Sequence, residues 1–423
     1  AYRPIHLSNG RMRALQDIAS QNGLDRRLWM PPSLPYFGAR IAASKVLVFS
    51  QWAMVPDSIA ALLSYETERR MGMGDQWGSY TATHSQRLNF RRTKGRLTGL
   101  RVLSLVIPSP TLAATVDPLE IFKSVGAMPN VNAMRSVVKE RLKNFADDLA
   151  LRFTAAKPSG FLERFRNNAD DAADERVANW DWACAASMDI SHKRFGTWLA
   201  EGRGLDTIVR EDGLEAWNEH LAALHEAASA KHLFGSPDRS QVLDHLTDLA
   251  LGSPANCALR ALARVAPDLG FDHPNMLSAA TRIGMAFRGL FNQPESIALL
   301  RGSSDEFYWQ AVLQYCAEHD LQSVMDEYVH MLLESEGLSD ADPCNAVTRI
   351  AEAIDEALSL KPAQIDIKSY KAKRGRIEIQ SNLRMRGRFA TRLLQKSQED
   401  GQMQRTDNVR GAFNSPFRPF VLA

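Results

Sequence analysis

The sequence contains few cysteines, and none of them stand in close pairs. The four are Cys184, Cys257, Cys316 and Cys344. A zinc knuckle or a CxxC redox site requires two cysteines a few residues apart, so this spacing excludes both. We therefore expect no metal site and a reducing, cytoplasmic setting.

Long apolar runs and targeting signals are also missing. No stretch approaches 18 uninterrupted apolar residues, so we expect no membrane span and no membrane partner. The first residues, Ala1-Tyr2-Arg3-Pro4, lack the features of a signal peptide. No initiator Met precedes them, and we expect the sequence to be a piece of a longer protein.

The motifs of nucleotide hydrolysis and acyl chemistry are absent as well. The sequence has no GxxxxGK-S/T loop to hold phosphates and no GxSxG nucleophile elbow. The glycine-rich stretch 72–78 lacks the Lys-Ser/Thr pair, and we interpret it as a loop. His225 and His232 stand seven residues apart, whereas a zinc protease needs two histidines four apart. We therefore expect no catalytic residue in this chain.

Charge is unevenly distributed along the chain. Residues 84–101 hold six Lys/Arg and no acid, and residues 367–418 hold thirteen Lys/Arg against four Asp/Glu. Residues 1–83 carry +3, so with a total of +2 residues 102–366 carry −16. Basic stretches of this kind suggest contact with a phosphate backbone. The alternative is a surface whose basic and acidic regions balance in space.

Strand and helix patterns alternate in the outer parts of the chain. Residues 45–50 form a short apolar run that is typical of a strand buried on both faces, and a helical pattern follows to Arg70. A strand near 383–392, a helix over 404–413 and a strand over 419–423 complete a βαβαβ series. This series predicts an α/β fold with an incomplete parallel sheet.

A long helical region interrupts that series. Residues 102–107 are apolar enough to predict a short strand, and amphipathic helical patterns follow. These patterns cover 131–155, 206–232, 240–265, 276–291, 305–334 and 343–360. We therefore divide the chain into a first α/β part over 1–70, a helical insertion over 71–370 and a second α/β part over 371–423.

Aromatic residues gather in a connector and in two helical positions. Residues 29–37 combine Trp29, Tyr36 and Phe37 with three prolines, which exclude a helix and predict an extended connector. We favour packing of this connector against its own domain over stacking on a nucleic-acid base. For the pair Trp180 and Trp182 and for Trp309 we likewise favour core packing.

Several segments resemble superfamily II helicases, most closely the Swi/Snf-related branch. Residues 45–52 (KVLVFSQW) resemble motif IV, residues 405–414 resemble the helix before motif V, and residues 420–423 match the strand that leads into motif V. Large bacterial helicase-related proteins with a long helical insertion are similar in residues 28–36, 251–262, 290–295 and 414–420.

The resemblance implies a C-terminal RecA-like lobe that is split by the insertion and ends just before motif V. It implies an ATP-dependent helicase or translocase in which this lobe lines the ATP cleft and grips DNA or RNA through the phosphate backbone. ATP and Mg²⁺ would be bound mainly by a preceding RecA-like lobe, which would be a partner of this one. We therefore expect this chain to be inactive alone and to hold no cofactor by itself.

Nine residues are the candidates for contact with nucleic acid or with the cleft between the lobes. They are Ser50, Gln51 and Trp52 after the first strand, Arg91, Arg92 and Lys94 in the basic segment, and Arg384, Arg386 and Arg388, which alternate along a strand. The last three could instead pair with the acidic insertion. A different hypothesis makes the acidic helical region a protein-interaction or regulatory module beside a degenerate motor lobe.

Overall fold

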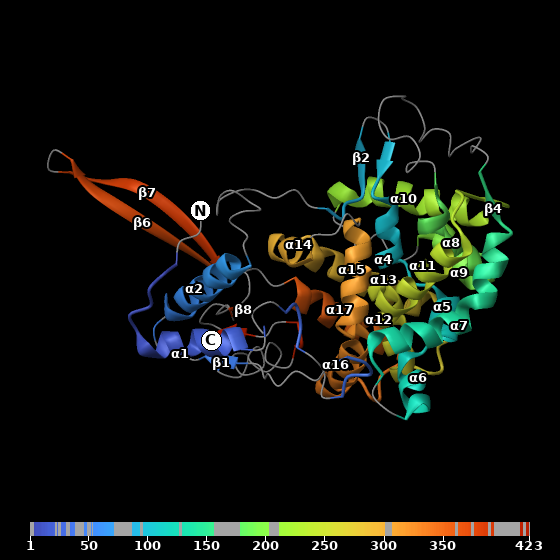
Figure 1. Ribbon diagram of the computed structural model, residues 1–423, viewed down its shortest axis with the longest axis horizontal. Coiled ribbons are helices and arrows are strands. Elements are labelled where there is room, and N and C mark those ends of the chain that lie inside the picture. Colours follow the sequence, from blue (N-terminus) through green and yellow to red (C-terminus); the bar gives the residue numbers. More distant parts are fainter. Residues whose placement is uncertain are drawn as a thin grey trace.

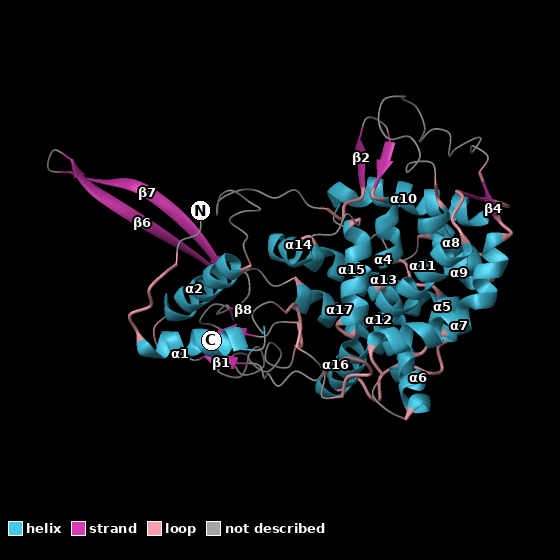
Figure 2. Cartoon of the chain, in the orientation of Figure 1, coloured by secondary structure: helices cyan, strands magenta, loops and turns pink. Residues whose placement is uncertain are grey.

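The structure is a computed structural model in which helices predominate. It describes residues 4–21, 23, 27–30, 34–38, 46–48, 52, 54–71, 87–93, 96–126, 129–155, 178–202, 211–300, 307–359, 363–373, 376–387, 391–392, 415–417 and 420–422. Figure 1 shows a large helical body and a smaller outer part from which a long β-hairpin projects. Figure 2 shows how few strands accompany the helices.

The helical body extends from a 3-10 helix, η2, to α17. Its helices are η2 Leu100–Val102, α4 Leu103–Val106, α5 Pro110–Thr115, α6 Pro118–Val125, α7 Val131–Ala150, α8 Trp180–Asp189, α9 Lys193–Glu201, α10 Glu211–Ser229, α11 Arg239–Gly252, α12 Pro254–Val265, α13 Pro274–Phe291, α14 Pro294–Leu300, α15 Tyr308–Glu318, α16 Leu321–Ser335 and α17 Pro343–Leu358. Two small strand pairs lie at its surface. They are β2 Arg91–Thr93 with β3 Arg96–Thr98, antiparallel, and β4 Phe153–Thr154 with β5 Leu233–Phe234, parallel.

Local signals set where these helices begin. Asp117, Asn130, Asp238 and Asp342 are N-caps whose side chains accept backbone N–H groups of the first turn. Each of the six predicted helical segments contains a helix, with three refinements. The first helix, α7, ends at Ala150, and Phe153–Thr154 within the predicted segment 131–155 form β4 instead. The segment 240–265 is divided into α11 and α12 before Pro254, and the segment 305–334 into α15 and α16 near Asp320.

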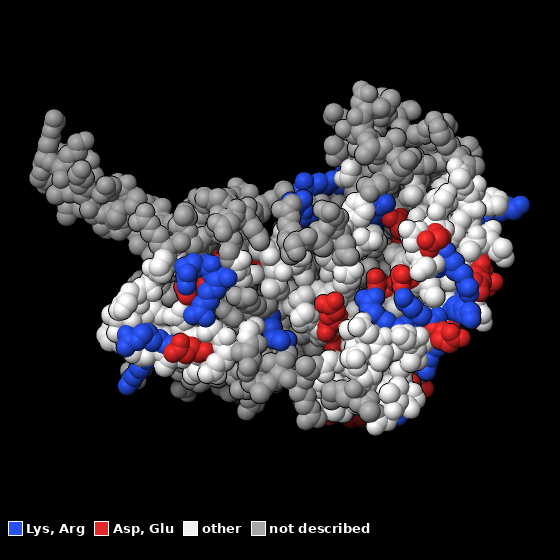
Figure 3. All heavy atoms as spheres, in the orientation of Figure 1, with Lys and Arg blue, Asp and Glu red and all other residues white. Residues whose placement is uncertain are grey.

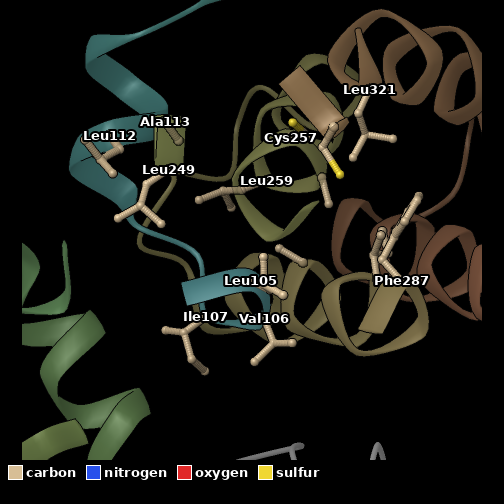
Figure 4. Packing of buried hydrophobic residues seen from close by; sticks show 14 of the residues in the cluster. Leu105, Val106, Ile107, Leu112, Ala113, Leu249, Cys257, Leu259, Phe287 and Leu321 are labelled. Atoms are coloured by element: carbon tan, nitrogen blue, oxygen red, sulfur yellow. The ribbon is translucent and has the colours of Figure 1, made fainter. Parts of the chain in front are cut away.

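α12 is the central helix of the body. All residues from Pro254 to Leu262 are buried, and α12 contacts α4, α5, α11, α13 and α16. Figure 4 shows Cys257 and Leu259 of this helix among side chains from α4, α5, α11, α13 and α16. On α13, a Cβ at Gly284 would lie 2.9 Å from the Cα of Val106, so only glycine allows α4 to pack this closely.

Buried polar groups connect α12 to its neighbours. The fully buried Arg260 donates Nε–H to Gln322 Oε1 at 2.6 Å and a terminal N–H to the Ala250 carbonyl at 2.7 Å. One turn later, Arg264 donates to both carboxylate oxygens of Asp117, at 2.9 and 2.7 Å. It also pairs with Asp326 at 3.0 Å. Buried charges persist in a core only when they are paired in this way.

The outer part combines two helices with a small parallel sheet. Its elements are α1 Gly10–Ser20, β1 Val46–Val48, α2 Met54–Arg70, β8 Thr391–Arg392 and β9 Phe420–Leu422. The strands lie in the order β1-β9-β8, with Val46 opposite Phe420 and Thr391 opposite Val421. Ala19, Ala60 and Leu63 form a small core in which Val46 and Val48 also pack.

A long antiparallel hairpin leaves the outer part beside α2. It consists of β6 Ala363–Lys373 and β7 Arg376–Gly387, with a register shift between Ser369 and Tyr370. α2 contacts both strands, and the hairpin extends away from the helical body (Figure 1).

The connector before β1 and the segment before β9 meet on the helical body. The Trp29 ring contacts Phe287, Phe291 and Tyr315 edge-on, with ring centroids 5.1 to 6.5 Å apart. Phe417 packs edge-on against Phe287 and Tyr328. The Met30 N–H donates to the Pro416 carbonyl at 2.5 Å, which joins the two segments directly. We call this cluster the aromatic junction, and it confirms that the connector packs against its own chain.

The rest of the connector is fixed to α16. Asp320, immediately before that helix, accepts the backbone N–H groups of Tyr36 and Phe37 at 2.6 and 3.2 Å. The Tyr36 hydroxyl donates to Asp326 at 2.8 Å. Core packing of Trp182 and Trp309 is confirmed too, since both side chains are buried.

The predicted RecA-like α/β fold is wrong. The chain is mainly helical, and the parallel strands in the described residues are only two or three residues long. Residues 383–387 of the strand predicted near 383–392 belong to β7, which pairs antiparallel with β6, whereas Thr391–Arg392 form β8, which pairs parallel with β9. Polar and apolar residues alternate through 376–387, whereas a strand buried on both faces of a parallel sheet is apolar almost throughout. The predicted helix 404–413 lies outside the described residues.

The predicted strand over 102–107 is also wrong. These residues form the end of η2 and the short helix α4, and Leu103, Leu105 and Val106 are buried. A short apolar run does not distinguish a buried strand from a buried helical segment. Here the run belongs to a helix that is buried in the core. The proposed domain boundaries stay predictions.

We expect the Trp29→Ala substitution to reduce the free energy of unfolding by about 3 to 5 kcal/mol, because it empties a buried aromatic site. Urea unfolding followed by circular dichroism measures the change. Trp52→Ala is the matched control, because 75% of the Trp52 side chain is exposed, and it should cost less than about 1 kcal/mol. Equal losses for both variants would contradict the role of the junction.

A second expectation concerns the buried His245. Its ring lies between Trp180 and Trp309, with centroids 5.5 and 5.7 Å away, and burial lowers the pKa of His245 to about 4. The unfolded chain binds a proton near pH 6.5 that the folded chain does not, so stability should fall as the pH decreases from about 6.5 toward 4.

Urea unfolding at pH 7.0 and 4.5 tests this expectation. His245 should account for about 2 to 3 kcal/mol of the difference between the two pH values. The His245→Gln variant should lose that share of the pH dependence, whereas the exposed control His192→Gln should keep it. The same pH dependence in both variants would count against a neutral buried His245.

Candidate nucleic-acid interface

The basic segment is fixed to the helical body where α13 ends. Asn292 Oδ1 accepts the backbone N–H groups of Arg87 and Leu88 at 3.0 and 2.8 Å, and Asn292 Nδ2 donates to the Leu88 carbonyl at 2.8 Å. Leu88 is buried, and Phe90 packs edge-on against Trp217 and His220 at about 5 Å. The two residues anchor the chain immediately before β2.

Arg288 reinforces this anchor from α13. Its Nε–H donates to the Leu88 carbonyl at 2.7 Å, and its guanidinium lies 5.0 Å from the centre of the Phe90 ring. Burial lowers the pKa of Arg288 to about 10, and the positive charge of Arg91 adds to this shift. Both causes disfavour the charged form of the guanidinium, as burial and a nearby like charge do in general.

Arg87, Arg91 and Arg288 therefore form a basic cluster, which we call the body patch. Arg87 and Arg91 are exposed, and none of the three forms an ion pair with another described residue. The body patch is thus a surface on which an anion would find positive charge that no acid in the described part of the chain pairs with.

Arg92 differs from its neighbour Arg91. Its guanidinium pairs with Glu219 of α10 at 3.0 Å. Successive residues of a strand point to opposite faces, so β2 presents Arg91 and Arg92 on different sides. The sequence predicted both as site residues, and the structure distinguishes them by their partners.

Glycine is required where β3 returns to the body. Gly99 has a φ of +90°, and a Cβ there would lie 2.0 Å from the Asn89 carbonyl oxygen. Any other residue would push β3 away from the anchored segment 87–90. The position of Arg91 over Arg288 therefore depends on this close backbone approach.

Arg384 and Arg386 lie on the hairpin, not beside the body patch. Both belong to β7, where their register partners on β6 are Asp366 and Gln364. Figure 1 shows β2 on the helical body and β6–β7 projecting from the outer part, at the other end of the molecule. The structure thus places the predicted residues on two separate basic surfaces rather than on one track.

The remaining predicted site residues are only partly accounted for. Trp52 is exposed between β1 and α2. Ser50, Gln51, Lys94 and Arg388 lie outside the described residues. The sequence prediction missed Arg288, because one arginine in the last turn of a long helix is a common feature of helix C-termini.

Neither a metal centre nor a spanning helix emerges from the described ranges. In these residues no group of three or more His, Cys, Asp or Glu could hold a metal ion. No single described helix is long and apolar enough to cross a membrane, although the bent pair Leu100–Val106 and Pro110–Val125 reaches that length and composition. Leu105, Val106, Leu112 and Ile121 of this pair are buried in the core.

Two surface cavities of the body lie away from the predicted residues. One, of about 670 Å³, is lined by Phe145, Arg152 and Phe271 among others. The other, of about 870 Å³, lies between α9 and α10 and includes His225 and Glu226. Neither is lined by a predicted site residue, so the two basic surfaces remain the candidate interface.

Comparison with known proteins adds no relative. No protein-family model matches the chain, and no curated protein or solved structure matches it. The resemblance to superfamily II helicases therefore rests on the sequence segments alone and stays a prediction.

Proposed function

We propose that this chain binds nucleic acid through the phosphate backbone. The observation that carries the proposal is the body patch, in which Arg87, Arg91 and the half-buried Arg288 have no described acidic partner. A guanidinium donates two parallel hydrogen bonds to a phosphate, and a partly buried one loses less free energy to hydration on binding. Phosphates spaced along a strand would supply the missing negative charge.

The segments that resemble motif IV and the strand before motif V support a motor setting for this binding. In that setting the chain would contribute to an ATP-dependent helicase or translocase without being catalytic alone. ATP and Mg²⁺ would be held mainly by a part of the protein outside this chain, and a cytoplasmic location goes with this proposal.

A protein-interaction role for the acidic helical region is the alternative. Residues 102–366 carry −16, which would suit a basic partner. Many of these acids are already engaged, since Asp117, Asp147, Asp244, Asp248, Glu352 and Asp355 form ion pairs within the body. Figure 3 shows acidic and basic side chains interleaved over this face of the body. The body patch, by contrast, forms no ion pair with any described acid, which favours an anionic partner.

The adjacent residues Arg91 and Arg92 provide a matched test. We expect Arg91→Ala to weaken binding to a fluorescent 20-nucleotide strand about three- to tenfold at 0.1 M salt, and to make the log–log salt slope less negative by about 0.7. Arg92→Ala should change the affinity less than about twofold, because Glu219 already neutralises that charge. Fluorescence anisotropy over a salt series measures both values, and circular dichroism checks the fold.

Equal loss of affinity in the two variants would show that the body patch is not part of the nucleic-acid interface. Absence of binding by the unaltered chain at low salt would overturn the proposed function itself.

Removing the ion-pair partner of Arg92 should strengthen binding rather than weaken it. Glu219→Gln removes the carboxylate that pairs with Arg92 at 3.0 Å while keeping the side-chain shape. We expect tighter binding by about two- to fourfold, and a salt slope more negative by up to about 0.7. The same measurement on the double variant Glu219→Gln/Arg92→Ala should show no gain, and a gain there would contradict the explanation.

A further inference from the structure

Phe307 is an exposed aromatic residue on the helical body. It is the first of three consecutive aromatic residues at the start of α15. Trp309 is buried, and the Tyr308 hydroxyl donates to the Phe291 carbonyl at 2.6 Å, whereas Phe307 is 41% exposed. A single exposed apolar side chain is common on protein surfaces, so a role for Phe307 depends on its neighbours.

Arg101 covers one side of the Phe307 ring. Its guanidinium lies 4.9 Å from the centre of the ring, within the range of cation–π contacts. Arg101 also forms an ion pair with the buried Asp181, which fixes the position of the guanidinium. The ring is therefore held in place by a neighbour that is itself fixed to the body, and its exposed area is available to another partner.

The contact with Arg101 places Phe307 beside the basic segment. Arg101 stands two residues after Gly99. Gly99 lies against the backbone of Asn89, since a Cβ on Gly99 would be 2.0 Å from the Asn89 carbonyl oxygen. Asn89 in turn stands two residues before Arg91. Phe307 and Arg91 are thus connected by two short stretches of backbone that touch each other.

A second set of contacts connects Phe307 to Arg87. The next residue, Tyr308, donates to the carbonyl of Phe291 at the end of α13, and the adjacent Asn292 accepts the Arg87 backbone N–H at 3.0 Å. Burial raises the pKa of the Tyr308 hydroxyl, and the positive charge of nearby Arg87 partly opposes this rise. Phe307 therefore belongs to the same surface as the two exposed arginines of the body patch.

An exposed ring beside arginines that pair with no described acid suits one class of nucleic acid. The bases of a single strand stack on aromatic side chains while basic residues contact the phosphates. In a duplex the bases already stack on one another, so this surface would reach the phosphates alone. We infer that the body patch binds single-stranded DNA or RNA with one base stacked on Phe307. This inference rests on the proposed function and names its substrate class.

Three probes test the substrate class with the full 423-residue chain at 0.15 M salt. They are a 20-nucleotide DNA strand, an abasic strand of the same length that keeps the phosphates and lacks the bases, and the 20-base-pair duplex. We expect the complete strand to bind about five- to thirtyfold more tightly than the abasic strand, because the latter has nothing to stack on the ring. It should also bind more tightly than the duplex.

Substitutions at Phe307 separate stacking from packing. Phe307→Ala and Phe307→Leu should each lose most of the preference for the complete strand, because neither side chain has a ring face, whereas Phe307→Tyr should keep it. The salt slope should stay the same in all three variants, since no charge is removed. Leu151→Ala is the control, because it shortens another exposed apolar side chain of the body, and it should keep the preference. Matching unfolding curves would show that each variant is folded.

Photocrosslinking locates the stacked base. A strand in which 5-iodouracil replaces thymine forms crosslinks with aromatic side chains that stack on it, and mass spectrometry of the digested complex should place a crosslink at Phe307. Crosslinks at other residues alone would contradict the inference.

The outcomes distinguish this inference from the proposed function. Equal affinity for the complete and abasic strands, or an unchanged preference in Phe307→Ala, would overturn stacking on Phe307 even if Arg91→Ala weakens binding to every probe. Tighter binding of the duplex than of the single strand would overturn the substrate class and leave phosphate binding in place. Absence of nucleic-acid binding by the unaltered chain would overturn both proposals.

Discussion

The aromatic junction is the interaction on which the arrangement of this chain depends. Trp29 and Phe417 are separated by almost the whole sequence, yet both pack against Phe287 of α13. The segments that carry them also lead into β1 and β9, the paired strands of the outer sheet. Burial of the two rings therefore holds the outer part, and with it the hairpin, against the helical body. The hydrogen bonds that Asp320 accepts from the connector also fix the orientation of the connector on the body.

Helices could be predicted from the sequence because each carries its own signal. Apolar residues at helical spacing and capping residues such as Asp238 and Asp342 lie within the segment itself. Strand pairing is decided by residues far apart, and here the prediction was wrong. The alternation in 376–387 was present in the sequence, but its partner β6 was assigned to the helical insertion. The helicase resemblance also favoured a parallel sheet there.

The candidate site was predictable in its residue types but not in its geometry. The basic segment around Arg91 and the alternating Arg384 and Arg386 were visible as charge patterns. The sequence could not show that Glu219 pairs with Arg92, or that Arg288 joins the basic segment. Both features depend on contacts between residues more than one hundred positions apart. Spacing along the chain gives no distance in space. The sequence therefore could not show that the basic segment around Arg91 and the strand with Arg384 and Arg386 lie in separate parts of the molecule.

The junction also has a consequence for the order in which the chain acquires structure during synthesis. The helices from α4 to α17 pack against one another, so most of the body can form once residue 358 has emerged. β1 has to wait for β9, and the site of Phe417 stays empty until residues 417–422 emerge. Until then, a nascent chain would present a folded body beside an unpaired β1 and an open aromatic site. Such exposed apolar surface is what general chaperones bind, and it closes only when β9 pairs with β1.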